Sequence, residues 1–139
     1  MSLSIRNQLP GTVTAVNPGE AMATVRIRLS GGQDLTAAIT REAADDLSLT
    51  AGTEVRALVK ATEVSVATGR VEGLSIRNRL AGTVTALTTG DAMASVRVAV
   101  EGAELTAAVT REAADDLGLS VGVPVVALVK STEVSLATA

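Results

Sequence analysis

The chain has 139 residues, 47% of them hydrophobic, a formal net charge of −3, and no histidine, cysteine or aromatic residue. Without His and Cys, catalytic triads, thiol nucleophiles and the usual zinc sites are excluded, and the negative balance offers no basic field to nucleic acid or an anionic membrane. We therefore expect a protein that is not an enzyme and binds neither nucleic acid nor a membrane surface. No apolar run approaches the roughly 18 residues that a membrane span needs, so we expect the protein to be cytoplasmic.

The sequence is an internal duplication. Ser-Ile-Arg-Asn begins at Ser4 and again at Ser75, and Thr-Arg-Glu-Ala-Ala-Asp-Asp-Leu begins at Thr40 and again at Thr110. The turn at 30–33 is one residue longer than its counterpart in the second copy. Repeats of this length indicate duplicated domains rather than a solenoid array. We therefore assign a first domain to residues 1–68, a linker to 69–73 and a second domain to 74–139.

Short strands separated by turns make up each copy. The first copy predicts strands at 3–9, 11–16, 21–29, 35–39, 55–59 and 63–66, with the clearest alternation of apolar and polar residues over 21–29. A short helix should begin at Thr40 and at Thr110, because threonine is a good N-cap and helix-forming and acidic residues follow it. Five or six strands with one helix between the fourth and fifth are typical of an OB-like barrel. We predict an all-β fold of two tandem OB-like barrels.

The absence of aromatic residues bears on assembly. Each half must build its core from Val, Leu, Ile, Ala and Met. A domain of this size buries only about 60% of its unfolded surface, and no disulfide is present to supply the missing stability. We expect the protein to be an oligomer.

The repeated positions with binding chemistry carry hydrogen-bond donors. They lie on the opening strand, at the helix start and after the strand 55–59, and include Ser4, Arg6, Asn7, Thr40 and Lys60. A helix N-terminus directs backbone N–H groups and the positive end of the helix dipole outward, which suits an anion. The alternative is that the short helix only closes the open end of a barrel.

These motifs together resemble the molybdate-binding Mop domain of the TOBE type. The resemblance rests on Ser-Ile-Arg-Asn, on Thr-Ala-Ala-Ile-Thr-Arg-Glu-Ala-Ala-Asp-Asp-Leu and on Leu-Val-Lys-Ala-Thr-Glu-Val-Ser, and covers residues 3–68 and 74–138. Two such domains in one chain are similar to a tandem (di-Mop) molbindin. The resemblance implies OB-like barrels that exchange their first strand, a homotrimer with six domains, and cytoplasmic storage and homeostasis of molybdate or tungstate without a catalytic cofactor.

Sites of the first kind in this family lie between neighbouring domains. The matching positions come from the Ser-Ile-Arg-Asn and lysine motifs of one domain and from the helix start of its neighbour. They are Ser4, Arg6, Thr40, Ala43, Lys60 and Ala61, and in the other repeat Ser75, Arg77, Thr110, Ala113, Lys130 and Ser131. The family usually has serine at the positions of Ala43 and Ala113, a change that is harmless if this position acts through its backbone N–H.

A second, axial kind of family site uses a Gly-Ala-Val-Asn-like turn near a threefold axis. The corresponding residues are Asn7, Gly19, Ala21 and Met22, with Asn78, Gly90, Ala92 and Met93 in the second repeat. Methionine replaces the asparagine of the turn, and Glu20 and Asp91 each add a carboxylate, which repels a dianion unless it points away.

Two competing hypotheses have different consequences. An OB-type nucleic-acid module would use a basic groove and aromatic stacking platforms, and this composition contains no aromatic residue. A protein-interaction module without an anion-storage role would instead bring down one stoichiometric partner in a pull-down, and the purified protein would hold no anion.

Overall fold

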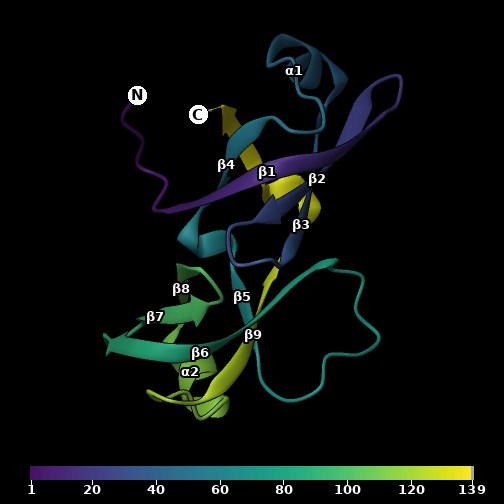
Figure 1. Ribbon diagram of the computed structural model, residues 1–139. Helices are drawn as coiled ribbons and strands as arrows, with labels where there is room; N and C mark the ends of the chain where they lie inside the picture. Colours follow the sequence, from purple (N-terminus) through teal and green to yellow (C-terminus); the bar gives the residue numbers. More distant parts are fainter. Residues whose placement is uncertain (139) are drawn as a thin grey trace.

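The computed structural model describes residues 1–138, which form two five-stranded antiparallel sheets at opposite ends of the molecule (Figure 1). The first repeat contains β1 (Asn7–Pro18), β2 (Met22–Leu29), β3 (Asp34–Thr40), α1 (Arg41–Asp46), β4 (Glu54–Val59), the 3-10 turn η1 (Ala61–Glu63) and β5 (Ser65–Ala67). The second contains β6 (Asn78–Thr89), β7 (Met93–Val100), β8 (Ala103–Thr110), α2 (Arg111–Asp116), β9 (Pro124–Val129), η2 (Ser131–Glu133) and β10 (Ser135–Thr138). Both sheets curl, and the predicted all-β fold of two barrel-like units is confirmed.

The opening of each repeat differs from the prediction. The strands predicted at 3–9 and 11–16 form one continuous strand, β1, which starts only at Asn7. Pro10 stays in register with β4. Gly11 lets β1 approach β2, because a Cβ there would lie 2.6 Å from a side-chain carbon of β2. These two residues mark close packing rather than a break, so α1 follows the third strand of the repeat and not the fourth.

An aliphatic core fills each barrel. In β2, Ala23, Val25, Ile27 and Leu29 are buried and the residues between them are exposed, as the alternation over 21–29 predicts. β7 repeats the pattern. The core contains only Leu, Ile, Val and Ala, so each buried side chain contributes the modest transfer energy of a small aliphatic group, about 1.5–3 kcal/mol for Val, Leu or Ile.

The short helices begin where the sequence predicts. Thr40 has an extended backbone, and its Oγ1 accepts a hydrogen bond from the backbone N of Ala43 at 3.1 Å. This bond satisfies one of the helix's unpaired N–H groups, as an N-cap does. Ala44 is buried, and α1 packs on β2 and β3. Thr110, Ala113 and α2 repeat this geometry in the second barrel.

The two repeats exchange their last strands. β10 pairs with β4 of the first repeat, and β5 pairs with β9 of the second. In Figure 1 the yellow C-terminal strand lies in the purple and blue sheet of the first repeat. Within this chain the first strands, β1 and β6, pair inside their own repeats. The exchange of first strands between domains that the resemblance implies stays a prediction. Each chain segment crosses to the other barrel just before its last strand, where η1 packs on β8 and η2 packs on β3.

The exchange changes the meaning of the predicted domains. Residues 1–68 and 74–139 are units of sequence repetition, whereas each barrel takes four strands from one unit and its fifth from the other. Ala139, the last residue of the second unit, lies outside the described residues.

Two asparagines join the barrels. The side chain of Asn7 donates from Nδ2 to the carbonyl of Thr106 at 2.8 Å and accepts at Oδ1 from the backbone N of Thr106 at 2.8 Å. Asn78 makes the same pair of bonds with Thr36, at 2.8 and 2.7 Å. Both asparagines are 2% exposed. Each amide therefore acts as one more strand residue at the edge of β3 or β8, and satisfies backbone groups that burial would otherwise leave unpaired.

The β2–β3 and β7–β8 turns also meet between the barrels. A Cβ on Gly31 would lie 1.8 Å from the carbonyl oxygen of Glu101, and one on Gly102 would lie 2.6 Å from the backbone N of Gly31. Neither position has room for a side chain, so glycine permits the two backbones to touch.

Candidate functional site

The Ser-Ile-Arg-Asn motif and the lysine motif of the second repeat come together as predicted. Ser75 and Arg77 precede β6, and Lys130 and Ser131 lie where β9 passes into η2. All four line one pocket of about 300 Å³. A hydrogen bond holds the turn from Lys130 into η2, because the backbone N of Glu133 donates to the carbonyl of Lys130 at 2.9 Å. These four side chains present an ammonium, a guanidinium and two hydroxyls, a group of donors suited to an oxyanion.

The first repeat places the corresponding residues at the same points of its chain. Ser4 and Arg6 precede β1 and are exposed. Lys60 follows β4 with an extended backbone, and Ala61 begins η1. Ala61 has no hydroxyl where Ser131 has one, so the second group has one donor more than the first.

The helix starts supply the other part of the predicted sites. The Thr40 hydroxyl and the Ala43 backbone N are both engaged, because they bond to each other. The backbone N–H of Ala113 is donated to Thr110 in the same way. A contact of either alanine N–H with an anion stays a prediction. The hydroxyl hydrogen of Thr40 remains available, since Oγ1 serves only as the acceptor in the cap.

Acidic residues surround each helix start. A pocket of about 560 Å³ contains Thr40 and Arg41 together with four carboxylates, Glu20, Glu42, Asp45 and Asp46. A pocket of about 540 Å³ at Thr110 has the corresponding composition. Arg41 contributes the one positive charge and is itself paired with Asp45 at 3.3 Å. A dianion in this pocket alone would meet more negative than positive charge.

The two parts of each predicted site do not share a pocket in one chain. The pocket of Lys130 contains neither Thr40 nor Thr110. The packing nevertheless brings η2 against β3, the strand that ends at Thr40, and η1 against β8, the strand that ends at Thr110. The lysine motif of each repeat therefore lies beside the strand that leads to the helix start of the other.

The predicted axial residues fall into two separate places. Gly19 and Met22 close the β1–β2 turn, with the N of Gly19 donating to the carbonyl of Met22 at 2.7 Å. Arg41 Nη1 donates to the carbonyl of Gly19 at 3.0 Å and ties this turn to α1. Asn7 lies at the opposite end of β1. This strand is 12 residues long, which is a length of roughly 40 Å at the rise of an extended strand. A single repeat thus cannot unite Asn7 with its turn, and the amide of Asn7 is already engaged by the other barrel.

The turns themselves are otherwise open. Ala21 and Ala92 are exposed, and Met22 and Met93 are 47% and 48% exposed. The second repeat has the same turn, with the N of Gly90 donating to the carbonyl of Met93 at 2.8 Å. Asn78 is engaged by Thr36 as Asn7 is by Thr106.

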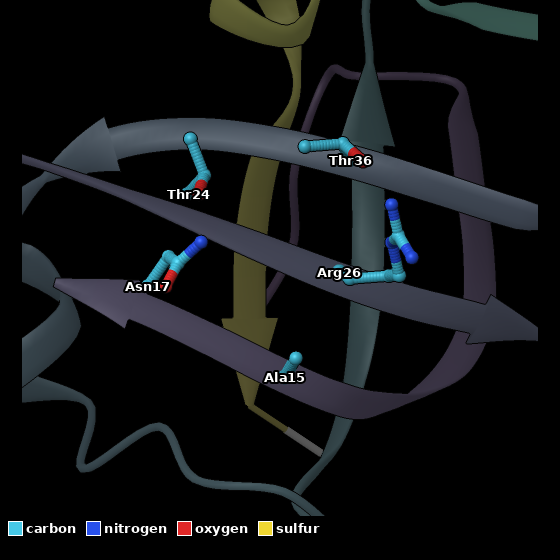
Figure 2. A pocket seen from close by; sticks show the side chains of 5 residues that line it. All are labelled: Ala15, Asn17, Thr24, Arg26 and Thr36. Atoms are coloured by element: carbon cyan, nitrogen blue, oxygen red, sulfur yellow. The ribbon is translucent and has the colours of Figure 1, made fainter.

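One polar pocket was missed by sequence reasoning. It lies on the outer face of the first sheet, has a volume of about 240 Å³, and is lined by Ala15, Asn17, Thr24, Arg26 and Thr36 (Figure 2). The side chains come from three adjacent strands, β1, β2 and β3. The alternation over 21–29 identified Thr24 and Arg26 as outward-facing, but only the pairing of the strands places them beside Asn17 and Thr36.

Among residues 1–138, no group of three or more acidic side chains is arranged to hold a metal ion. In that same part of the chain, no helix has the length and apolar character to cross a membrane.

Each of the two repeats matches a known domain family. The TOBE domain model matches residues 3–66 and again residues 74–136. The molybdenum-pterin-binding protein MopA of Rhodobacter capsulatus is 42% identical over 139 residues, which cover 99% of this chain and 52% of MopA. The molybdenum transport protein ModE of Azotobacter vinelandii is 38% identical over 138 residues, which cover 99% of this chain and 51% of ModE. The chain therefore spans about half the length of these relatives.

A solved structure extends the likeness to the whole fold. The structure of the cytoplasmic molybdate-binding protein ModG, in a form with molybdate bound, matches with a TM-score of 0.96 and 42% identity. The match covers 100% of both chains. The two sequence matches and this shared fold show that the chain belongs to the TOBE domain family, of which it carries two tandem copies.

Proposed function

We propose that this protein binds molybdate, and tungstate equally well, and serves in molybdenum storage and homeostasis in the cytoplasm. The observation that carries the proposal is the full-length likeness to molybdate-bound ModG, at a TM-score of 0.96. The donor pocket of Ser75, Arg77, Lys130 and Ser131 provides the matching chemistry. The protein acts as a binding protein and not as an enzyme, and needs no catalytic cofactor.

The donor composition explains how molybdate would be selected. Molybdate is a fully deprotonated tetrahedral dianion near neutral pH, so it can accept hydrogen bonds from every donor around it. Hydrogen phosphate carries a proton that needs an acceptor, and Lys130 and Arg77 have none to offer. Sulfate has shorter central bonds and cannot reach all donors at once, whereas tungstate is nearly the size of molybdate.

The complete site requires more than one chain in this proposal. The donor pocket and the helix start lie apart within a chain, and the helix start is rich in carboxylates. A homotrimer, with six domains, would bring the helix start of one domain to the donor group of its neighbour. The aliphatic core and the exposed Met22 and Met93 agree with burial between subunits.

Calorimetric titration tests the proposal directly. We expect molybdate and tungstate to bind tightly, and sulfate and phosphate to give no saturable heat at the same sites. Loss of one charge-assisted hydrogen bond costs about 1.5–3 kcal/mol, so Lys130→Ala and Arg77→Gln should each weaken one class of site about ten- to a hundredfold. Arg70→Gln, which removes a guanidinium from an exposed linker side chain, is the matched control and should leave affinity unchanged.

The outcomes separate the hypotheses. Equal response to all four anions would reduce the sites to general anion pockets. Unchanged molybdate affinity in Lys130→Ala would refute the site assignment while leaving molybdate binding in place. Retention of full affinity in a chain held monomeric would refute the requirement for a neighbouring subunit.

A further inference from the structure

The outer-face pocket of the first sheet is organised in two cross-strand rows. Ala15 pairs with Arg26 and Arg26 with Thr36, while Asn17 pairs with Thr24 in the neighbouring row. Residues paired across adjacent strands have neighbouring side chains on the same face. The methyl side chain of Ala15 leaves space beside Arg26, and the result is a pocket of about 240 Å³. Figure 2 shows the five side chains that line it.

The charge of Arg26 is not neutralised by an ion pair. The adjacent carboxylate, Asp34, is taken by Arg28, whose Nε lies 2.6 Å from Oδ1 and whose Nη2 lies 3.4 Å from Oδ2. Within residues 1–138 Arg26 forms no salt bridge. A two-point contact to Arg28 keeps the carboxylate from turning toward Arg26, because both of its oxygens are engaged.

The second repeat shows what happens without Arg28. Its corresponding arginine is Arg97, and Ala99 stands where the first repeat has Arg28, opposite Glu104. Glu104 now pairs with Arg97, with Nε and Oε1 3.1 Å apart. Two differences between the repeats, Ala99 for Arg28 and the longer Glu104 for Asp34, accompany the change from an open arginine to one that is paired within its own sheet.

The wall of the pocket is held by the other barrel. Thr36 is bound at both its backbone N and its carbonyl by Asn78, which fixes the edge of β3. The side chains around Arg26 offer acceptors as well as donors, since threonine hydroxyls and the Asn17 amide do both. This mixture can also receive the proton of a partly protonated oxyanion.

We propose that Arg26, Thr24, Thr36 and Asn17 form a binding site for a small oxyanion with two or more terminal oxygens, the shared chemistry of phosphate and carboxylate groups. The guanidinium contacts two oxygens side by side, and the hydroxyls and the amide contact the others. The site lies on the outer face of the first sheet, apart from the Lys130 pocket, and is closed in the second repeat by Glu104.

The test follows the side-chain Nε–H signals of Arg26 and Arg97 by NMR during titration with phosphate, sulfate and acetate, with sodium chloride as the ionic-strength control. We expect a saturable shift of Arg26 with phosphate and no saturable shift of Arg97. The sulfate and acetate arms show which geometry, tetrahedral or planar, the site prefers. Lys130→Ala should leave the Arg26 response unchanged, which separates this site from the molybdate sites.

Two further variants test the cause. Arg28→Ala should release Asp34 to Arg26 and weaken phosphate binding at least about tenfold. Glu104→Gln should free Arg97 and produce a second responding arginine. A linear shift of Arg26 that sodium chloride reproduces, or a response of Arg97 equal to that of Arg26 in the unaltered protein, would overturn the proposal. Unchanged phosphate affinity in Arg28→Ala would overturn it as well.

Discussion

The asparagine contacts between the barrels support a quantitative prediction. Asn78→Ala removes two hydrogen bonds of 2.7 and 2.8 Å and leaves the N–H and carbonyl of Thr36 without their partner. Each bond contributes a net 0.5–1.5 kcal/mol, and a buried group left unsatisfied costs about 1–3 kcal/mol. Because two groups lose their partner, we expect the free energy of unfolding to fall by about 2–6 kcal/mol. Asn7→Ala should cost a similar amount, because its contacts with Thr106 are the same.

The assay is urea unfolding at one fixed protein concentration, since the stability of an oligomer depends on concentration. Asn17→Ala is the matched control, because Asn17 lies exposed at the far end of β1. It should change the free energy of unfolding by less than about 0.5 kcal/mol. A loss in Asn78→Ala no greater than that of the control would refute the reasoning that the buried amide completes the edge of β3.

The substitution Asn78→Asp adds a test with a defined sign. A carboxylate buried at this position would face the carbonyl of Thr36, so burial and that contact would raise its pKa above the ordinary value of about 3.9. The folded state would then bind a proton more readily than the unfolded state. The variant should therefore become less unstable, relative to the parent protein, as pH falls through the raised pKa. Parallel pH profiles for variant and parent would contradict this account.

Three other predictions concern stability. Gly31→Ala places a methyl group against the carbonyl of Glu101 and should lower the free energy of unfolding by about 1–3 kcal/mol, measured by urea unfolding. Thr40→Ala removes the N-cap acceptor of α1 and should cost about 1 kcal/mol, with Thr14→Ala as an exposed control; an equal loss in both would exclude a capping role. The hydrogen bond from Arg28 holds the pKa of Asp34 below its usual value, so its contribution to stability is present above the unfolded pKa and is lost as pH falls through the lowered one. Asp34→Asn should therefore have a shallower acid-side stability profile, and an unchanged slope would show that the pair contributes nothing.

The repeat structure and most of the local elements follow from sequence alone. The alternating apolar residues over 21–29 form the buried face of β2, because successive side chains of a strand point to opposite faces and only one face of this strand is exposed to solvent. Thr40 begins a helix because its hydroxyl caps the first turn. The donor set of Ser75, Arg77, Lys130 and Ser131 could also be found, since these residues occupy repeated motif positions, and the structure places all four in one pocket.

At some positions the local sequence allows two interpretations, and packing against distant residues determines which one the structure adopts. Pro10 and Gly11 have the composition of a break between strands, yet they lie inside β1 because Gly11 lets the backbone of β2 approach closely. Asn7 matched a motif for anion binding, but the edge of β8 in the other barrel uses both ends of its amide. In both cases the partner is distant in sequence, so no local pattern could reveal it.

The sequence by itself determined that the chain is a duplicated all-β protein with an aliphatic core and repeated oxyanion donors. These properties depend on residue type and on spacing within a few positions. Only the tertiary structure decided that β5 and β10 change places, that Asn7 and Asn78 join the barrels, and that Arg26 is open where Arg97 is paired. The physical reason is that strand pairing and ion pairing depend on register between segments far apart in the chain. The carboxylate beside these arginines pairs differently in the two repeats, where Ala99 replaces Arg28 and Glu104 replaces Asp34.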